Sequence, residues 1–273
     1  MTYNLTVSVV LFNTDEEEIS NISETILRLD LKTKLFFVDN SPTNKLELVI
    51  KKDDRIEYIH SGKNVGFGSG HNIAIKCAKD IAEFHLVLNA DVNFDVSILN
   101  AIYDFMVKNQ DIGLLAPKIL NPDGSIQYSA KLLPSPANLI VRRFIPSKSL
   151  KAKMDFNYEF HFFDFNRIVE VPYLMGCFMF INTKVFKIVD GFDERFFMYP
   201  EDIDLTRRIY KHFKTVYYPE VTIVHQHGRG SYKSIKLLYY HITSMIKYFN
   251  KWGWFFDKDR KEINKNVLKQ FRN

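Results

Sequence analysis

The first part of the chain alternates short apolar runs with segments of helical length, and this alternation constrains the fold more than any other feature. The apolar runs cover residues 6–12, 34–38, 55–60 and 84–88. Each is long enough for a buried strand and too short for a helix. Helix-length segments follow at about 16–29 and 72–81. The pattern predicts an α/β fold, a mainly parallel Rossmann-like sheet flanked by helices.

Composition narrows the class of protein. The chain has 273 residues, 46% of them hydrophobic, so a sizeable core can form. The formal net charge of +5 favours an anionic ligand or a membrane surface without requiring nucleic acid. Two cysteines, Cys77 and Cys177, lie in apolar settings that fit a reducing compartment. No basic leader precedes the first strand, and no apolar run reaches the ~18 residues of a spanning helix. We expect a cytoplasmic protein, or one peripheral on the inner face of the cell membrane.

Two oxygen-bearing side chains end the run at 84–88. Asn89 and Asp91 flank Ala90 directly after this predicted strand. Ligands of open α/β sheets bind beyond the carboxyl ends of the strands. A carboxylate there suits a hard cation such as Mg²⁺ or Mn²⁺, which would hold phosphate oxygens in turn. Asp91 can equally cap a turn, because Asn and Asp are ordinary turn residues, so other segments must decide.

A glycine-rich loop at 61–70 leads into the helix expected at 72–81. It contains Asn64-Val65-Gly66-Phe67-Gly68-Ser69-Gly70. Glycines before a helix are typical of dinucleotide sites, but the spacing here is GxGxG and the loop follows the third strand rather than the first. A dinucleotide-binding oxidoreductase is therefore a remote alternative. At the end of the second predicted strand, Asp39 could accept hydrogen bonds from a nucleobase or a ribose, or cap a turn.

Three acids, Glu201, Asp202 and Asp204, stand at the start of a helix that Pro200 introduces. Acids are favoured at this end of the helix dipole, which lowers the pKa of a carboxyl group. Burial among the neighbouring aromatic residues would raise that pKa toward the range of a general base. Further on, His225 and His227 are two residues apart at a probable strand end, so both imidazoles could face one side and bind a cation.

Two segments depart from the alternating pattern. Residues 131–168 mix prolines with basic residues, and we expect an irregular, basic surface insertion. In 231–273, apolar residues recur at three- and four-residue spacing with lysines between them, as in an amphipathic helix. This C-terminal helical extension could lie on an anionic membrane, pack on the domain itself, or form a homodimer interface.

Seven motifs occur in order along the chain. They are Val9-Val10-Leu11-Phe12-Asn13, Val38-Asp39-Asn40-Ser41, Asn64-Val65-Gly66-Phe67-Gly68, Leu88-Asn89-Ala90-Asp91, Gly191-Phe192-Asp193-Glu194, Glu201-Asp202-Ile203-Asp204-Leu205, and His225 with Gly228. Together they resemble glycosyltransferase family 2, in the branch rich in bacterial rhamnosyltransferases. The resemblance implies a GT-A fold over residues 1–230, inverting chemistry and a divalent cation, Mg²⁺ or Mn²⁺.

The same resemblance assigns roles to residues. Asp202 would be the catalytic base, with Glu201 beside it, and Asp91, His225 and His227 would bind the metal. Donor binding would fall to Asn13, Asp39, Asn64, Gly66, Gly68, Asn72, Asn89, Asp91 and Gly176. One departure concerns the metal motif, which is Asp-x-Asp in many relatives. Here its first position is Asn89, which can coordinate only through its carbonyl oxygen, so a weaker cation site is expected.

The expected reaction moves rhamnose or another hexose from a dTDP-sugar or UDP-sugar to a saccharide acceptor. The basic segments suit an acceptor carried on a lipid diphosphate, as in the synthesis of a bacterial surface polysaccharide such as O-antigen. A catalytically inactive homologue that binds nucleotide sugars is the second alternative, against which the intact Glu201-Asp202 pair argues.

Overall fold

The computed structural model describes residues 2–142, 145–226 and 235–271. The strands are β1 (Tyr3–Leu11), β2 (Thr33–Asp39), β3 (Ile56–His60), β4 (Ala82–Leu88), β5 (Val92–Asn93), β6 (Ile112–Leu120), β7 (Ala130–Lys131), β8 (Val169–Glu170), β9 (Tyr173–Leu174), β10 (Phe178–Asn182) and β11 (Lys214–His225). The helices are α1 (Glu16–Leu27), α2 (Phe67–Ala78), α3 (Ser97–Lys108), α5 (Lys148–Tyr158), α6 (Glu201–Tyr210), α8 (Ile235–Trp252) and α9 (Lys258–Lys269). Shorter helical turns are η1 (Lys45–Val49), η2 (Ala137–Val141) and η3 (Thr183–Lys187).

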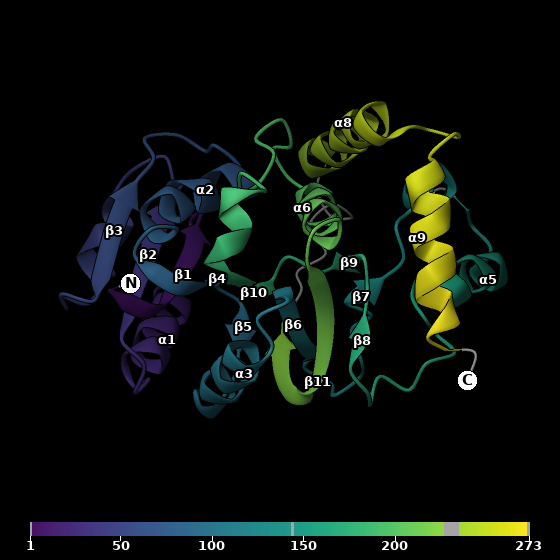
Figure 1. The fold of residues 1–273 in the computed structure, drawn as a ribbon. Helices are drawn as coiled ribbons and strands as arrows, with labels where there is room; N and C mark the ends of the chain where they lie inside the picture. The colour runs from purple at the N-terminus through teal and green to yellow at the C-terminus, as the bar shows by residue number, and fades with distance from the viewer. Residues whose placement is uncertain (1, 143–144, 227–234, 272–273) are drawn as a thin grey trace.

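One large sheet organises the molecule (Figure 1). Its strand order is β3-β2-β1-β4-β10-β6-β11-β5, and β8 pairs with β11. The strands β3, β2, β1 and β4 are all parallel, as the sequence predicts. Strand β10 then runs antiparallel to both β4 and β6, so the complete sheet is mixed. The predicted α/β class is confirmed, and the parallel half ends where β10 inserts.

Helices cover both faces of this sheet (Figure 1). On one face, α1 and α3 contribute Ile22 and Ile102 to a core cluster that also contains the alternate β1 residues Val7 and Val9. On the other face lie α2 and α6, whose buried residues include Ile75 and Leu205. Burial on both faces explains why the strands are apolar almost throughout.

A buried polar row interrupts the face of β1 that α2 covers. The Thr6 and Ser8 hydroxyls lie 2.9 Å from the two ring nitrogens of His85 on β4. The Ser8 hydroxyl also lies 2.7 Å from Nδ1 of His71 on α2. Burial holds the pKa of both imidazoles below the ordinary value, so both rings are neutral. These bonds fix α2 against the sheet and therefore fix the loop that precedes α2.

The segment 131–168 is more ordered than its composition suggests, and the expectation of an irregular insertion is wrong. It contains η2 and the helix α5. It also contributes Tyr158, Phe160 and Phe165 to the core cluster beneath α6. In the sequence, basic residues lie between the apolar residues of this segment. The apolar residues are spaced too irregularly to predict a helix.

The two C-terminal helices pack on the rest of the molecule. Met245 and Phe249 of the apolar stripe on α8 are buried, whereas Ile235 at the start of α8 is 87% exposed. The Asn264 side chain on α9 donates to and accepts from the backbone of Leu133, at 2.9 Å in each case. The later half of the stripe is thus core. No helix in the described ranges is long and apolar enough to cross a membrane.

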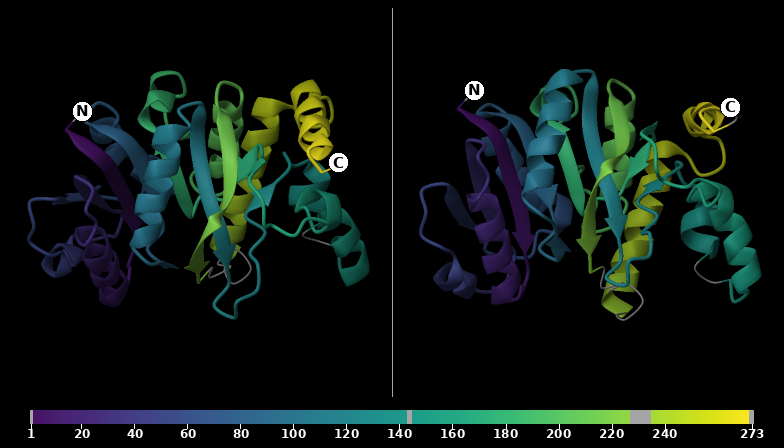
Figure 2. Two further views of the ribbon diagram at one scale, coloured as in Figure 1. Left: turned by 60° about the horizontal axis from the view of Figure 1, so that its bottom comes forward. Right: turned by 90° about the horizontal axis from the view of Figure 1, so that it is seen from below.

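Strand β11 is continuous, although the two short apolar runs at 216–218 and 221–224 in the sequence predict two separate strands. Its pairing with β6 shifts register between Tyr218 and Thr222. Pro219 lies within this irregularity, and proline has no N–H to donate to the ladder. The strand ends at His225, at the edge of the sheet from which α8 begins (Figure 2).

Candidate active site

The glycine-rich loop reaches the start of α2 through a backbone that other residues cannot adopt. Gly66 has φ +92°, and a Cβ there would lie 2.2 Å from the Phe197 carbonyl oxygen. The Phe67 N–H donates to the same carbonyl oxygen at 3.1 Å. The Asn64 side chain accepts a hydrogen bond from the Gly66 N–H at 3.0 Å. The loop therefore lies directly against the segment that leads into α6.

Asp39 ends β2 and is fully buried. One carboxylate oxygen accepts a hydrogen bond from the Ser41 N–H at 2.8 Å. The other accepts from the Tyr58 hydroxyl at 2.6 Å. Ser41 also accepts a hydrogen bond from the N–H of Asn13, which has a positive φ of 50°. These bonds bring Asp39 and Asn13 together at the carboxyl edge, where the sequence predicts nucleotide binding.

Asp91 and His225 form a pair at the same edge. The His225 Nε2 lies 3.3 Å from an Asp91 carboxylate oxygen. The opposite ring nitrogen, Nδ1, lies 3.0 Å from the Gln127 side-chain oxygen. The Gln127 amide donates to the His225 carbonyl at 2.8 Å, so Gln127 fixes both the ring and the backbone of the histidine. Gln127 has no counterpart among the sequence predictions, because it lies about a hundred residues away from His225 in the chain.

The pair is ionised at neutral pH. Burial alone would disfavour an imidazolium ion, but the hydrogen bonds to Asp91 and to Cys177 raise the pKa of His225 to about 10. Burial likewise opposes ionisation of Asp91, and its hydrogen bond with His225 holds the pKa of Asp91 below the ordinary value. A cation that binds His225 must therefore displace a proton.

This edge offers oxygen ligands of the kind that a hard divalent cation prefers, together with one imidazole nitrogen. Asp91 supplies a carboxylate, His225 supplies an imidazole nitrogen, and the side-chain oxygen of Asn89 is buried without a hydrogen-bond partner. An unpartnered buried carbonyl oxygen costs free energy unless a ligand satisfies it. Within the described ranges no cluster of three or more His, Cys, Asp or Glu is placed to hold a metal ion.

Carboxylates gather around this edge. Asn13, Phe67, Asn89 and Asp91 line a cleft of about 370 Å³, together with Asp15, Glu18 and other residues. A neighbouring hollow of about 410 Å³ shares Asp91 and adds acids of α1. Burial and the negative charge of Asp91 raise the pKa of Glu18. The negative charges of these carboxylates oppose the binding of an anionic ligand in this cleft.

Asp202 lies at the start of α6 with both carboxylate oxygens held by backbone. One accepts a hydrogen bond from the Ile203 N–H at 2.8 Å and the other from the Gly176 N–H at 3.0 Å. A Cβ on Gly176 would lie 3.1 Å from the Asp202 Cβ, tighter than most real contacts, so glycine leaves room for this approach. Burial raises the pKa of Asp202, whereas these backbone bonds and the positive charge of Lys131 oppose the rise.

Glu201 differs from its neighbour. It is buried, and one of its carboxyl oxygens has no hydrogen-bond partner. Burial, followed by the negative charge of Asp202, raises the pKa of Glu201 well above the ordinary value. When two adjacent carboxyl groups titrate in this way, one keeps its proton while the other ionises. The arrangement favours Asp202 as the ionised group.

Two adjacent residues, Gly176 and Cys177, join the two halves of the site. The Gly176 N–H holds Asp202, and the Cys177 carbonyl accepts a hydrogen bond from the Asn89 N–H at 2.9 Å. The Asp202 carboxylate and the Asn89–Asp91 turn are therefore attached to the backbone of two consecutive residues. The sheet thus brings together residues that are more than a hundred positions apart in the sequence.

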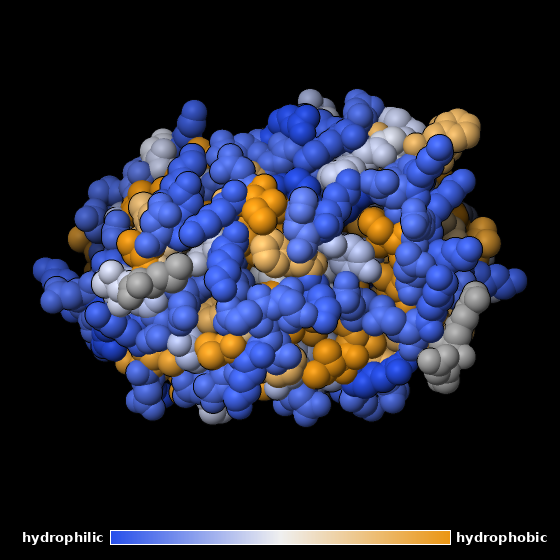
Figure 3. Space-filling view, viewed as in Figure 1, coloured by the Kyte–Doolittle hydropathy of each residue, from blue (hydrophilic) through white to orange (hydrophobic). Residues whose placement is uncertain are grey.

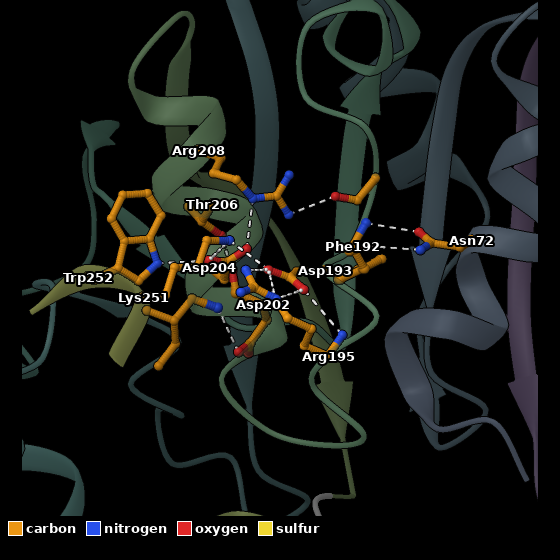
Figure 4. A network of polar contacts seen from close by, with 12 residues as sticks. Asn72, Phe192, Asp193, Arg195, Asp202, Asp204, Thr206, Arg208, Lys251 and Trp252 are labelled. Carbon is orange, nitrogen blue, oxygen red and sulfur yellow. Dashed lines mark hydrogen bonds and ion pairs between the residues drawn. The ribbon is translucent and has the colours of Figure 1, made fainter. Parts of the chain in front are cut away.

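Three predicted residues remain, namely Gly68, Asn72 and His227. Gly68 packs against Phe192, where a Cβ would lie 2.9 Å from the Phe192 Cβ. The Asn72 amide binds both backbone polar groups of Phe192, at 2.8 and 2.9 Å, so Asn72 holds the 191–194 turn (Figure 4). His227 lies outside the described residues.

Comparison with known proteins gives a consistent result. The family model described as "Glycosyl transferase family 2" matches residues 6–187. An N-acetylglucosaminyl-diphospho-decaprenol L-rhamnosyltransferase of Mycobacterium tuberculosis is 25% identical over 241 residues, covering 81% of this chain and 76% of the relative. The rhamnosyltransferase WbbL of Escherichia coli K12 is 24% identical over 250 residues, covering 88% and 90%.

A solved structure extends the comparison to the fold. The mannosyltransferase PcManGT from Pyrobaculum calidifontis, in complex with GDP-Man and Mn²⁺, superposes with a TM-score of 0.58 at 13% sequence identity. The match covers 90% of this chain and 65% of that one. At this identity the likeness concerns the fold alone, and it confirms the predicted GT-A type.

Proposed function

Because the chain belongs to glycosyltransferase family 2, we propose that this glycosyltransferase moves a hexose from a nucleoside-diphosphate sugar to a saccharide acceptor, with inversion and with a divalent cation. The observation that carries the proposal is the attachment of Asp202 and the Asn89–Asp91 turn to the consecutive residues Gly176 and Cys177. A base and a diphosphate site must lie on either side of one sugar for an in-line displacement, and this connection supports that arrangement.

Donor binding is assigned to the edge formed by β1, β2 and the glycine-rich loop. Asp39 is fully buried and held by Ser41 and Tyr58, so its carboxylate would contact a nucleobase or a ribose only after the residues that cover it move. The names of the rhamnosyltransferase relatives support rhamnose as the transferred sugar, and we propose a dTDP-sugar or a UDP-sugar as its donor.

The cation is assigned to Asp91 and His225, with Asn89 as a neutral third ligand and His227 as a further candidate. When bound, Mg²⁺ or Mn²⁺ offsets the negative charge that develops on the departing nucleoside diphosphate. Asp91 is ionised at neutral pH, as a cation ligand requires, and Gln127 orients the His225 ring. The carboxylates of the cleft give a second reason for a cation, since a diphosphate alone would be repelled.

Asp202 is assigned as the general base. It would accept the proton of the acceptor hydroxyl while the oxygen attacks the anomeric carbon opposite the leaving group. Two backbone N–H groups fix the carboxylate, and burial keeps its pKa above that of an exposed aspartate. Glu201 would keep its proton and donate a hydrogen bond to the acceptor or to the base.

The acceptor is assigned as a saccharide carried on a lipid diphosphate, in the synthesis of a surface polysaccharide. The name of the relative from Mycobacterium tuberculosis includes an acceptor of this kind, a sugar on a lipid diphosphate, and this supports the assignment. The first turns of α8 leave Ile235 and Tyr239 exposed, 87% and 64%, at the edge where β11 ends (Figure 2). A peripheral position on the membrane would bring this edge to the acceptor. The face seen in Figure 3 is mostly hydrophilic, with small separate apolar patches.

A transfer assay tests the proposal. The purified chain is incubated with dTDP-rhamnose or UDP-sugars and an N-acetylglucosaminyl diphosphate polyprenol, in Mn²⁺, Mg²⁺ or EDTA. We expect cation-dependent product whose anomeric configuration, read by NMR, is opposite to that of the donor. Donor binding without transfer to any acceptor would favour the inactive homologue, and retained configuration would contradict the inverting chemistry.

A further inference from the structure

The side chain of Lys251 connects the 191–194 turn with the helix α6 (Figure 4). The ammonium nitrogen of Lys251, near the end of α8, lies 2.6 Å from a carboxylate oxygen of Asp204 and 2.8 Å from one of Asp193. The Lys251 side chain is only 20% exposed, and the carboxylates of Asp204 and Asp193 are 0% and 13% exposed. Both contacts are therefore largely screened from water and stronger than surface ion pairs.

The first contact fixes the helix that carries the proposed base. Asp204 lies one turn into α6, two residues after Asp202. Besides Lys251, its carboxylate accepts hydrogen bonds from Arg208 at 2.7 Å and from the Trp252 indole N–H at 2.8 Å. Two of these three donors belong to the end of α8. The first turn of α6 is consequently held by α8 as well as by its own helix.

The second contact fixes the turn that supports the donor loop. Asp193 belongs to the 191–194 turn, which the Asn72 amide holds through the backbone of Phe192. Phe192 in turn packs against Gly68 in the first turn of α2. Lys251 thus connects this turn, and through it the glycine-rich loop, to the first turn of α6.

We infer that Lys251 is a positioning residue for glycosyl transfer, which sets the donor loop and the Asp202 helix relative to each other. The inference rests on the proposed function. Lys251 does not touch the reacting groups, and it acts through Asp193 and Asp204. Because donor and acceptor are bound by other residues, its loss should lower kcat while leaving KM for the donor nearly unchanged.

The kinetic test compares Lys251→Met, Asp193→Asn and the double variant with the wild type. We expect each single variant to lose about tenfold in kcat, with donor KM within about threefold, and the double variant to lose little more than either single one. Lys251→Arg, which keeps the charge, should recover part of the loss. Lys214→Met, which removes an exposed pair with Asp111 at 2.6 Å, is the control and should keep the wild-type kcat.

Hydrogen exchange measured by mass spectrometry gives a readout that does not need transfer. We expect Lys251→Met, or Asp193→Asn if the first variant does not fold, to speed exchange about tenfold in both 191–195 and 199–206, whereas Lys214→Met changes neither. Unchanged exchange in these two segments, or a folded Lys251→Met with wild-type kcat, would overturn the inference. If the wild type transfers no sugar at all, the proposed function fails, and the exchange result alone still decides whether Lys251 couples the two segments.

Discussion

Removing the charge of Asp257 should destabilise the whole chain, because this residue pairs with the buried Arg207 of α6. The two side chains are 1% and 3% exposed and share two hydrogen bonds of 2.7 Å. Removing one partner of a buried pair costs about 3–5 kcal/mol, since the other charge stays buried. Asp257 also caps α9 by accepting a hydrogen bond from the Arg260 N–H, a contact worth about 1 kcal/mol.

Substitution by asparagine separates the two contributions, because asparagine is also a good helix cap. We expect Asp257→Asn to lower the free energy of unfolding by about 3–5 kcal/mol, measured by urea denaturation followed by circular dichroism. Asp259→Asn is the matched control two residues further on. Its pair with Lys211 is exposed, so its loss should cost less than about 1 kcal/mol.

A second substitution checks the physical cause. Adding Arg207→Met to Asp257→Asn removes the uncompensated charge, so the double variant should be more stable than Asp257→Asn alone. Equal losses for Asp257→Asn and Asp259→Asn would refute the reasoning. The division into residues 1–230 and 231–273 remains a prediction.

Further predictions concern the site itself. Asp91→Asn should weaken Mn²⁺-dependent binding of UDP or dTDP at least tenfold by calorimetry, and equal affinity would remove Asp91 from the cation site. In the wild type, the apparent Mn²⁺ affinity should rise with pH toward the His225 pKa of about 10, because binding displaces a proton, and a flat profile would contradict this ligand role. The base must be ionised, so kcat should fall as pH drops through the raised pKa of Asp202. Lys131→Met removes a charge that lowers this pKa and should move the acid limb of the kcat profile to higher pH, whereas an unmoved limb would mean that another group titrates.

Local sequence patterns predict the strand ends and the residues that follow them. Asp39, Asn89 and His225 all follow or end apolar runs, and parallel strands bring such positions to one edge of the sheet. The spacing of acids in α6 likewise predicts that Asp204 turns away from Asp202 and pairs with a nearby arginine. The structure confirms the pairing, with Arg208 as the partner.

Local sequence patterns do not predict contacts between residues that are far apart in the sequence. Gln127 is ninety-eight positions from His225, and nothing in its neighbourhood marks it as a support for an imidazole. From the sequence pattern, Lys251 is one of several lysines on the polar side of an amphipathic helix. In the structure its side chain is mostly buried between two carboxylates. The helix α5 is missed because its apolar residues follow no regular period, and tertiary packing rather than propensity stabilises it.

The measurement that tests the central assignment most directly is the turnover of Asp202→Asn at saturating donor and acceptor. Asparagine is nearly isosteric, and its single side-chain oxygen can still accept one of the two backbone hydrogen bonds, but it cannot act as a base. We predict a loss of 10²–10⁴-fold in kcat, the usual effect of removing a positioned base, with donor affinity within a few-fold of the wild type. Near-normal turnover would contradict the assignment and make Glu201 the next candidate for the base.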